Sequence, residues 1–190
     1  MSCFVLGVGA VMLIGLIGCD KSGFKYSKYS NSSPIFGINI DYIKDWKWME
    51  HVYKEEKYAS VIFVPQNRKI LGESAGINIY EAPNLSVEPR TLEALANDLV
   101  VKKSHYDEAK VIKRSVIKLL GVQAIDIEMS FKIPENIRVF NAKLIPVKAR
   151  YVLLNKGEKF YVLKFMAGES DFAKNAKAYE HIAKSLRVSK

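Results

Sequence analysis

Hydrophobic and polar residues alternate along the stretch that begins at Pro34, which is the pattern of a strand with one buried face. The alternation runs through Phe36, Gly37, Ile38, Asn39, Ile40, Asp41 and Tyr42. A second β-rich stretch covers residues 58–64 and ends at Pro65, and Ile77 and Ile79 predict a short strand before Pro83. These three stretches predict β-structure up to about residue 80.

The period of the pattern changes at Thr91, where a helix is expected to begin. Thr91 is a good N-cap because its side-chain oxygen can accept a hydrogen bond from the first turn. Apolar residues then recur with helical spacing at Leu92, Leu95, Ala96, Leu99 and Val100.

Two hairpins are predicted next, the first from 111–120 and 122–131 around Gly121. In its second arm one face carries Gln123, Ile125, Ile127, Met129 and Phe131, and the other carries Ala124, Asp126, Glu128 and Ser130. We expect the face with Asp126 and Glu128 to be exposed to solvent. The second hairpin joins 149–154 to 159–166 through a turn in which Gly157 can adopt a positive φ.

A last helix is expected after Ser170, a candidate N-cap. Its apolar stripe would be Phe172, Ala176, Tyr179, Ile182, Ala183 and Leu186, and its polar face Lys174, Lys177, Glu180 and Lys184. Hairpins favour an antiparallel sheet, and helices must cover it to bury their stripes. The predicted fold class is therefore α+β, an antiparallel β-sheet flanked by helices.

The N-terminus carries an uncharged, mostly apolar run over residues 3–17, followed by a motif that resembles a bacterial lipobox, Leu16-Ile17-Gly18-Cys19. The resemblance implies cleavage between Gly18 and Cys19, acylation of the Cys19 thiol, and a lipid-anchored protein outside the cytoplasmic membrane. One departure is that no Lys or Arg precedes the apolar run. The run is short for a transmembrane helix. An uncleaved anchor and a soluble cytoplasmic protein remain as alternatives.

This interpretation divides the chain into a signal peptide (1–18), a tether (19–33) rich in Ser, Lys and Tyr, and one domain (34–190). The 172 residues left after cleavage suffice for a single hydrophobic core. Cys19 would be the only cysteine of the mature chain, which excludes an intramolecular disulfide.

The order of elements and several local stretches resemble PsbP-like domains, the PsbP/DcrB-like family. The matching stretches are Phe36 to Trp46, Ile77-Asn78-Ile79, Thr91 to Leu95, Arg150-Tyr151, the Gly157 hairpin, Tyr161-Val162-Leu163 and Ala183 to Val188. The family's Pro before Trp46 is replaced by Ile43. The resemblance implies an α/β/α sandwich and a non-enzymatic accessory protein, because the family's recurring residues form no catalytic set.

No residue pattern predicts catalysis, a cofactor or a metal. The histidines, His51, His105 and His181, are far apart, and a loop at 105–108 offers too few ligands for a zinc site. Phosphate-loop, dinucleotide-binding and serine-elbow motifs are missing from the sequence. Trp46 and Trp48 have two interpretations, the lining of a ligand pocket or a cluster in the core or at a sheet edge.

Positive charge is concentrated in the last part of the chain. Residues 136–190 contain 12 basic and 4 acidic residues, against 17 and 16 before them, within an overall net charge of +9. We expect some of these cations, Lys143, Lys148, Arg150, Lys156, Lys159, Lys174, Lys177 and Lys184, to share one side. Such a face favours phospholipid headgroups or an anionic envelope protein, and a lipid tether argues against nucleic acid.

The sequence therefore favours a lipid-anchored accessory, binding or assembly protein on the outer side of a bacterial membrane. Asp20 resembles the inner-membrane retention signal of enteric bacteria, but inner and outer membranes both remain open. The alternatives are a small-ligand-binding lipoprotein and a hydrolase with an unrecognised site.

Overall fold

A computed structural model describes residues 23–31, 37–53, 58–66, 74–81, 91–135, 139 and 141–188. Residues 1–18 and Cys19 lie outside the described residues. Strands come first in the chain, then one helix, two long hairpins and a last helix, which confirms the predicted order. The elements are β1 (Tyr26–Asn31), β2 (Ile38–Ile43), β3 (Trp46–Tyr53), β4 (Tyr58–Pro65), β5 (Ser74–Glu81), α1 (Leu92–Ser104), β6 (Asp107–Leu119), β7 (Val122–Pro134), β8 (Leu144–Lys156), β9 (Lys159–Gly168), α2 (Glu169–Ser185) and β10 (Arg187–Val188).

The strands form two sheets, and each pair of neighbouring strands is antiparallel. The larger sheet has seven strands in the order β3-β4-β5-β9-β8-β7-β6, and the smaller has the order β1-β2-β10. Both predicted hairpins are present. Gly121 (φ 81°) and Gly157 (φ 64°) turn the chain with positive φ, which glycine adopts at no steric cost.

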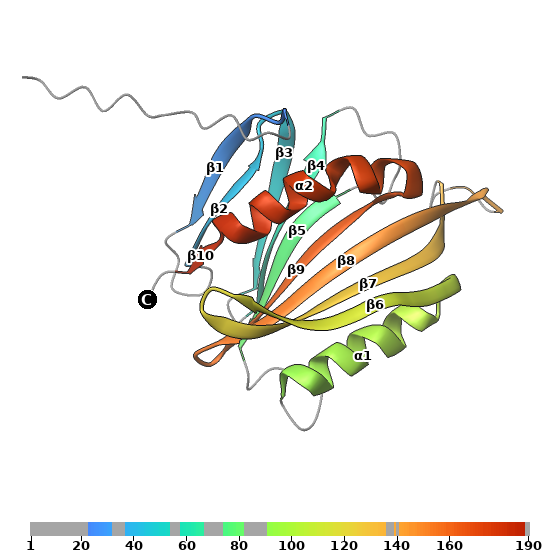
Figure 1. Cartoon of the computed structure of the whole chain (residues 1–190). Helices are drawn as coiled ribbons and strands as arrows, with labels where there is room; N and C mark the ends of the chain where they lie inside the picture. Colours follow the sequence, from blue (N-terminus) through green and yellow to red (C-terminus); the bar gives the residue numbers. More distant parts are fainter. Residues whose placement is uncertain are drawn as a thin grey trace, which may run out of the picture.

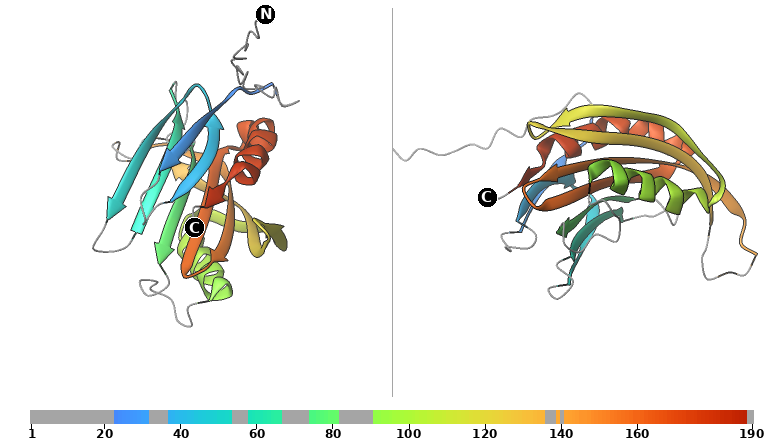
Figure 2. Two further views of the ribbon diagram at one scale, coloured as in Figure 1. Left: turned by 90° about the vertical axis from the view of Figure 1, so that its left-hand side faces the viewer. Right: turned by 90° about the horizontal axis from the view of Figure 1, so that it is seen from below.

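The two helices cover opposite faces of the larger sheet (Figure 1 and Figure 2). α1 packs against β6, β7 and β8, and Thr91 caps it as predicted, since its Oγ1 accepts from the Ala94 N–H (3.1 Å). The small sheet lies on the same face as α2, over the other half of the larger sheet. The predicted α+β fold, an antiparallel sheet flanked by helices, is confirmed.

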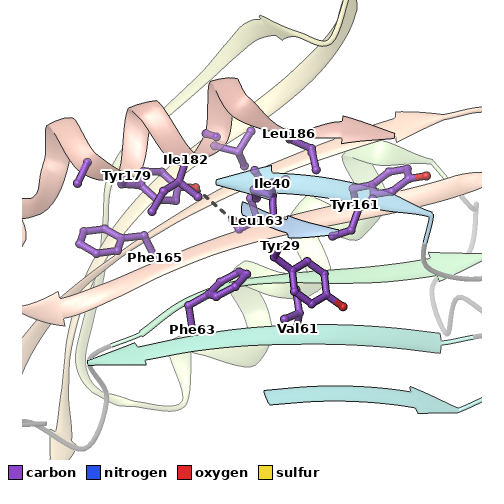
Figure 3. Close-up of a cluster of buried hydrophobic side chains, with 14 of the residues drawn as sticks. Tyr29, Ile40, Val61, Phe63, Tyr161, Leu163, Phe165, Tyr179, Ile182 and Leu186 are labelled. Atoms are coloured by element: carbon purple, nitrogen blue, oxygen red, sulfur yellow. Dashed lines mark hydrogen bonds between the residues drawn. The ribbon is translucent and has the colours of Figure 1, made fainter. Parts of the chain in front are cut away.

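The core on the α2 side joins both sheets (Figure 3). Tyr29 and Ile40 of the small sheet, Phe63 of β4, Leu163 of β9 and Tyr179 of α2 belong to one buried cluster. The Tyr179 hydroxyl donates to the Leu163 carbonyl oxygen (3.4 Å). The apolar stripe of the last helix is confirmed at most positions, although Ala178 is buried where Ala176 is only half-buried.

The predicted tether is wrong in its second half. Residues 26–31 form β1, which pairs with β2 along its whole length, from Tyr26↔Ile43 to Asn31↔Ile38. Tyr29 is 4% exposed and contacts Phe63 edge-on, with ring centroids 5.8 Å apart. The strand escaped the pattern analysis because its pairing comes from the backbone and a single buried side chain, which produces no alternation.

Two smaller expectations are also wrong. The last helix begins at Glu169 with Gly168 at its N-cap, so Ser170 lies inside the first turn and does not cap it. Asp126 is buried, 4% exposed, because α2 covers the strand face that we expected to be solvent-exposed.

Candidate anion-binding groove

A groove of about 530 Å³ lies where the small sheet meets the C-terminal end of α2. Figure 1 shows these elements side by side near the C-terminus of the chain. We call it the cationic groove and define it by its lining residues, which come from β1, β2, α2, the helix end and β10: Lys28, Asn39, Ile40, Asp41, His181, Lys184, Ser185 and Arg187.

A histidine–aspartate pair joins α2 to β2 at this groove. His181 Nε2 lies 2.9 Å from Asp41 Oδ2, and Nε2 must carry the hydrogen because a carboxylate only accepts. The imidazole is stacked on the Tyr26 ring at a centroid distance of 3.9 Å, with 19° between the ring planes. Packing on one side and a hydrogen bond on the other therefore fix the orientation of His181.

The Ser185 hydroxyl is fully engaged with the backbone. It accepts from the Asp41 N–H (2.8 Å) and donates to the Ile182 carbonyl oxygen (2.7 Å). Its proton therefore points at a carbonyl group and away from a base. Although serine, histidine and aspartate all line the groove, Ser185 lacks the hydrogen bond to a base that a nucleophile requires.

Three cations dominate the electrostatics of the groove. Lys28, Lys184 and Arg187 are all exposed, and in the described part of the chain none of them forms an ion pair with a carboxylate. Asp41 is the one acidic residue of the lining, and it is bonded to His181. Three positive groups and one negative group leave a formal charge of +2, with His181 counted as neutral.

Arg187 also neutralises the end of α2. Its Nη1 donates to the carbonyl oxygens of Lys184 (2.8 Å) and Leu186 (2.7 Å). The C-terminus of a helix carries partial negative charge on such carbonyl groups. The guanidinium therefore reduces the repulsion that this helix end would exert on an anion in the groove.

A second charged feature, beneath α2, is structural. Arg150 donates from Nε to Asp126 Oδ1 and from Nη2 to Asp126 Oδ2, both at 2.9 Å. The guanidinium also lies 5.5 Å from the centre of the Tyr179 ring and 3.7 Å from Glu180. The hydrogen bond to Asp126 raises the pKa of Arg150 above its ordinary value. Burial raises the pKa of Tyr179, so a charged guanidinium lies over the ring of a neutral tyrosine.

The predicted basic face is partly neutralised. Lys148 pairs with Glu169 (3.6 Å), Lys174 with Asp171 (3.0 Å), and Arg150 with Asp126. Lys184 is the only member of the predicted set that lines the cationic groove. Some cations of the predicted set thus pair with carboxylates of the protein, whereas Lys184 faces a cavity.

The aromatic pair on β3 lies apart from the groove. Trp46 packs against the core on the α2 side, whereas Trp48 is 49% exposed and contacts Tyr29 edge-on at 5.3 Å. β3 is an edge strand, which agrees with the core-or-edge interpretation of the two tryptophans.

Residues 105–108, which follow α1, contact strand β7. Tyr106 stacks on Phe131 at 4.9 Å, and Glu108 pairs with Lys132. Among the described residues, no group of three or more His, Cys, Asp and Glu side chains is placed to hold a metal ion. Within the same residues, no helix is long and apolar enough to cross a bilayer.

Most of the groove could not be predicted from the sequence. Asp41 and His181 are 140 residues apart, and Lys28 lay in the predicted tether. The exposed position of Lys184 on α2 was the one usable signal. A local pattern contains no information on which strand edge a helix end will reach.

No model of a known protein family matches the chain, and no curated protein matches it by sequence. Solved structures do match. A solution structure of cyanobacterial PsbP (CyanoP) from Synechocystis sp. PCC 6803 is 14% identical with a TM-score of 0.59, over 95% of this chain and 98% of that one. The Saccharomyces cerevisiae Ran-binding protein Mog1p is 10% identical with a TM-score of 0.52, over 87% and 96%.

LpqN of Mycobacterium tuberculosis, described as involved in cell envelope biogenesis, is 12% identical with a TM-score of 0.50, over 88% of this chain and 92% of that one. At these identities the likeness shows the fold alone. The chain therefore has the fold of the PsbP and Mog1p structures, in agreement with the fold that the sequence resemblance implied.

Proposed function

We propose that this protein is a lipid-anchored, non-enzymatic binding or assembly factor of the bacterial cell envelope, and that the cationic groove is its binding site. The observation that carries the binding role is the groove itself, which presents three unpaired cations in the described part of the chain. Its serine hydroxyl is engaged with the backbone. These features support binding of an anionic partner without chemical conversion.

The short distance along the chain between Cys19 and Lys28 supports a function in which the lipid anchor and the groove act together. Lys28 lies nine positions after Cys19 in the chain. A fully extended chain of that length spans at most about 32 Å. An acyl group on Cys19 would thus keep the groove near the bilayer surface, where anionic headgroups attract each nearby Lys or Arg by about 1 kcal/mol.

The structural likenesses agree with this proposal at the level of the fold. LpqN, which shares the fold, is described as involved in cell envelope biogenesis. Mog1p, which also shares it, is described as a Ran-binding protein. The same architecture thus occurs in proteins described by an envelope role and by a binding role.

The anchor is tested by replacing Cys19→Ser in the full chain, expressed in a bacterium that is fed radiolabelled palmitate. We expect the label to be lost and an uncleaved precursor to accumulate, because the thiol is the acylated group. Cys3→Ser is the matched control, since Cys3 precedes the cleavage site and its replacement should leave labelling intact. Equal labelling of wild type and Cys19→Ser would refute the anchor.

A further inference from the structure

We infer that the cationic groove binds a phosphate ester, either a soluble one or the headgroup of a phospholipid. This inference names the ligand class of the proposed binding function, and it does not depend on acylation of Cys19. The available charges, the arrangement of hydrogen-bond donors and the size of the cavity support it.

Cations of the groove remain available for a ligand. Most other cations beneath or beside α2 have an acidic partner within the protein, such as Arg150 with Asp126 and Lys174 with Asp171. Lys28 and Lys184 have no such bond among the described residues. Unpaired cations that converge from separate elements on one cavity favour an anion there, because their positive potentials add.

Part of the set of hydrogen-bond donors in the groove is preorganised. Arg187 uses Nη1 to hold two carbonyl oxygens at the end of α2, and the remaining guanidinium N–H groups make no bond within the described residues. A planar guanidinium fixed in this way suits the oxygens of a phosphate, and ammonium groups add point charges around it. Three cationic groups match a phosphate, which has several charged oxygens, better than a single carboxylate.

The cavity is larger than a phosphate ion, and all but one of its lining residues are polar or charged. Ile40 is the one apolar residue of the lining, and it is 3% exposed. Ligand cavities of about 300–1,000 Å³ commonly hold whole small molecules. A volume of about 530 Å³ therefore leaves room for a hydrophilic substituent. Asn39 and the Asp41–His181 pair provide polar groups for its hydroxyls.

The test uses the mature chain from residue 19 onward with Cys19→Ser, because every described element follows residue 22. Two probes are titrated. Binding of glycerol phosphate is measured by calorimetry. Binding to vesicles of phosphatidylglycerol mixed with phosphatidylcholine is measured by co-sedimentation. The groove variant is Lys28→Gln with Lys184→Gln. The charge-matched control is Lys110→Gln with Lys118→Gln, two exposed lysines of β6 that do not line the groove.

We expect the groove variant to bind at least about tenfold more weakly, because it loses two charge-assisted contacts, and the control to change by less than about twofold. Binding of glycerol phosphate identifies a soluble ester as sufficient. Binding to phosphatidylglycerol vesicles alone, with the same dependence on Lys28 and Lys184, identifies a headgroup at a surface.

Two results would overturn the inference. One is the absence of binding to both probes at low salt. The other is an equal loss in the groove variant and the β6 control, which would show a diffuse attraction to net charge. Because neither measurement involves acylation, a failure here is distinct from failure of the palmitate experiment.

Discussion

Asp126 and Arg150 show why a buried charge on a strand escapes sequence analysis. Asp126 lies between Ala124 and Glu128 on a face whose residues are mostly polar or small, which is typical of a solvent-exposed face. Arg150 comes from the neighbouring strand and supplies two parallel hydrogen bonds, so the carboxylate can be buried under α2. The partner determines the burial, and a single strand does not reveal its partner.

Removing one member of this pair should destabilise the fold. Asp126→Asn leaves the partly buried Arg150 without its bidentate acceptor, and Glu180, which is 51% exposed, compensates only in part. We expect the free energy of unfolding to fall by about 3 kcal/mol, measured by urea denaturation. Glu158→Gln, in the exposed hairpin turn, is the control and should change it by less than about 0.5 kcal/mol.

The double variant Asp126→Leu with Arg150→Met separates the two contributions to this effect. If the loss in Asp126→Asn comes from an uncompensated buried charge, removing both charges should restore most of the stability. A double variant as unstable as Asp126→Asn would instead indicate that the pair stabilises the fold by itself.

At the level of elements, helices and strands were predictable from the sequence wherever burial produced a period in the pattern of apolar residues. α1, α2 and both long hairpins were predicted because their side chains repeat with helical or strand spacing, and glycines with positive φ occupy the two predicted hairpin turns. β1 and β10 were missed because one has a single buried side chain and the other has two residues. Those two strands complete the small sheet, so the groove beside it could not be predicted either.

Deletion of β1 tests whether residues 26–31 belong to the domain. A chain that starts at residue 32 lacks Tyr29, which packs on Phe63 and hydrogen-bonds Glu50. Loss of such a buried aromatic residue should lower the free energy of unfolding by about 3 kcal/mol or more. A chain that starts at residue 23 keeps β1 and should match the mature protein in urea denaturation. Equal stability of the two truncated chains would restore the original tether interpretation.

At the level of the whole molecule, the seven-stranded sheet separates two cores that nonetheless share its strands. Val152 and Leu154 of β8 face α2, whereas Tyr151 and Leu153 of the same strand belong to the core beneath α1. The sequence resemblance implied this layered arrangement. It could not place the groove, because Asp41 and His181 meet only after the small sheet and α2 have both packed on the larger sheet. The shared strands predict that both cores unfold together.

Alkaline titration tests this cooperativity, because buried tyrosines lie in both cores. Burial raises the pKa of Tyr161 from 10.0 to about 12, and burial also raises the pKa values of Tyr179, on the same side, and Tyr151, in the core beneath α1. The folded state favours the neutral phenol of each buried tyrosine. The contribution of these tyrosines to the free energy of unfolding is therefore complete below about pH 10 and is lost as the pH rises toward 12. For Tyr161 the difference is on the order of 3 kcal/mol. We expect these tyrosines to ionise in one step that coincides with the loss of β-structure. Tyrosinate absorbance measures the ionisation, and circular dichroism measures the β-structure. Two separate steps, with Tyr151→Phe removing amplitude from only one of them, would show that the two faces of the sheet unfold independently.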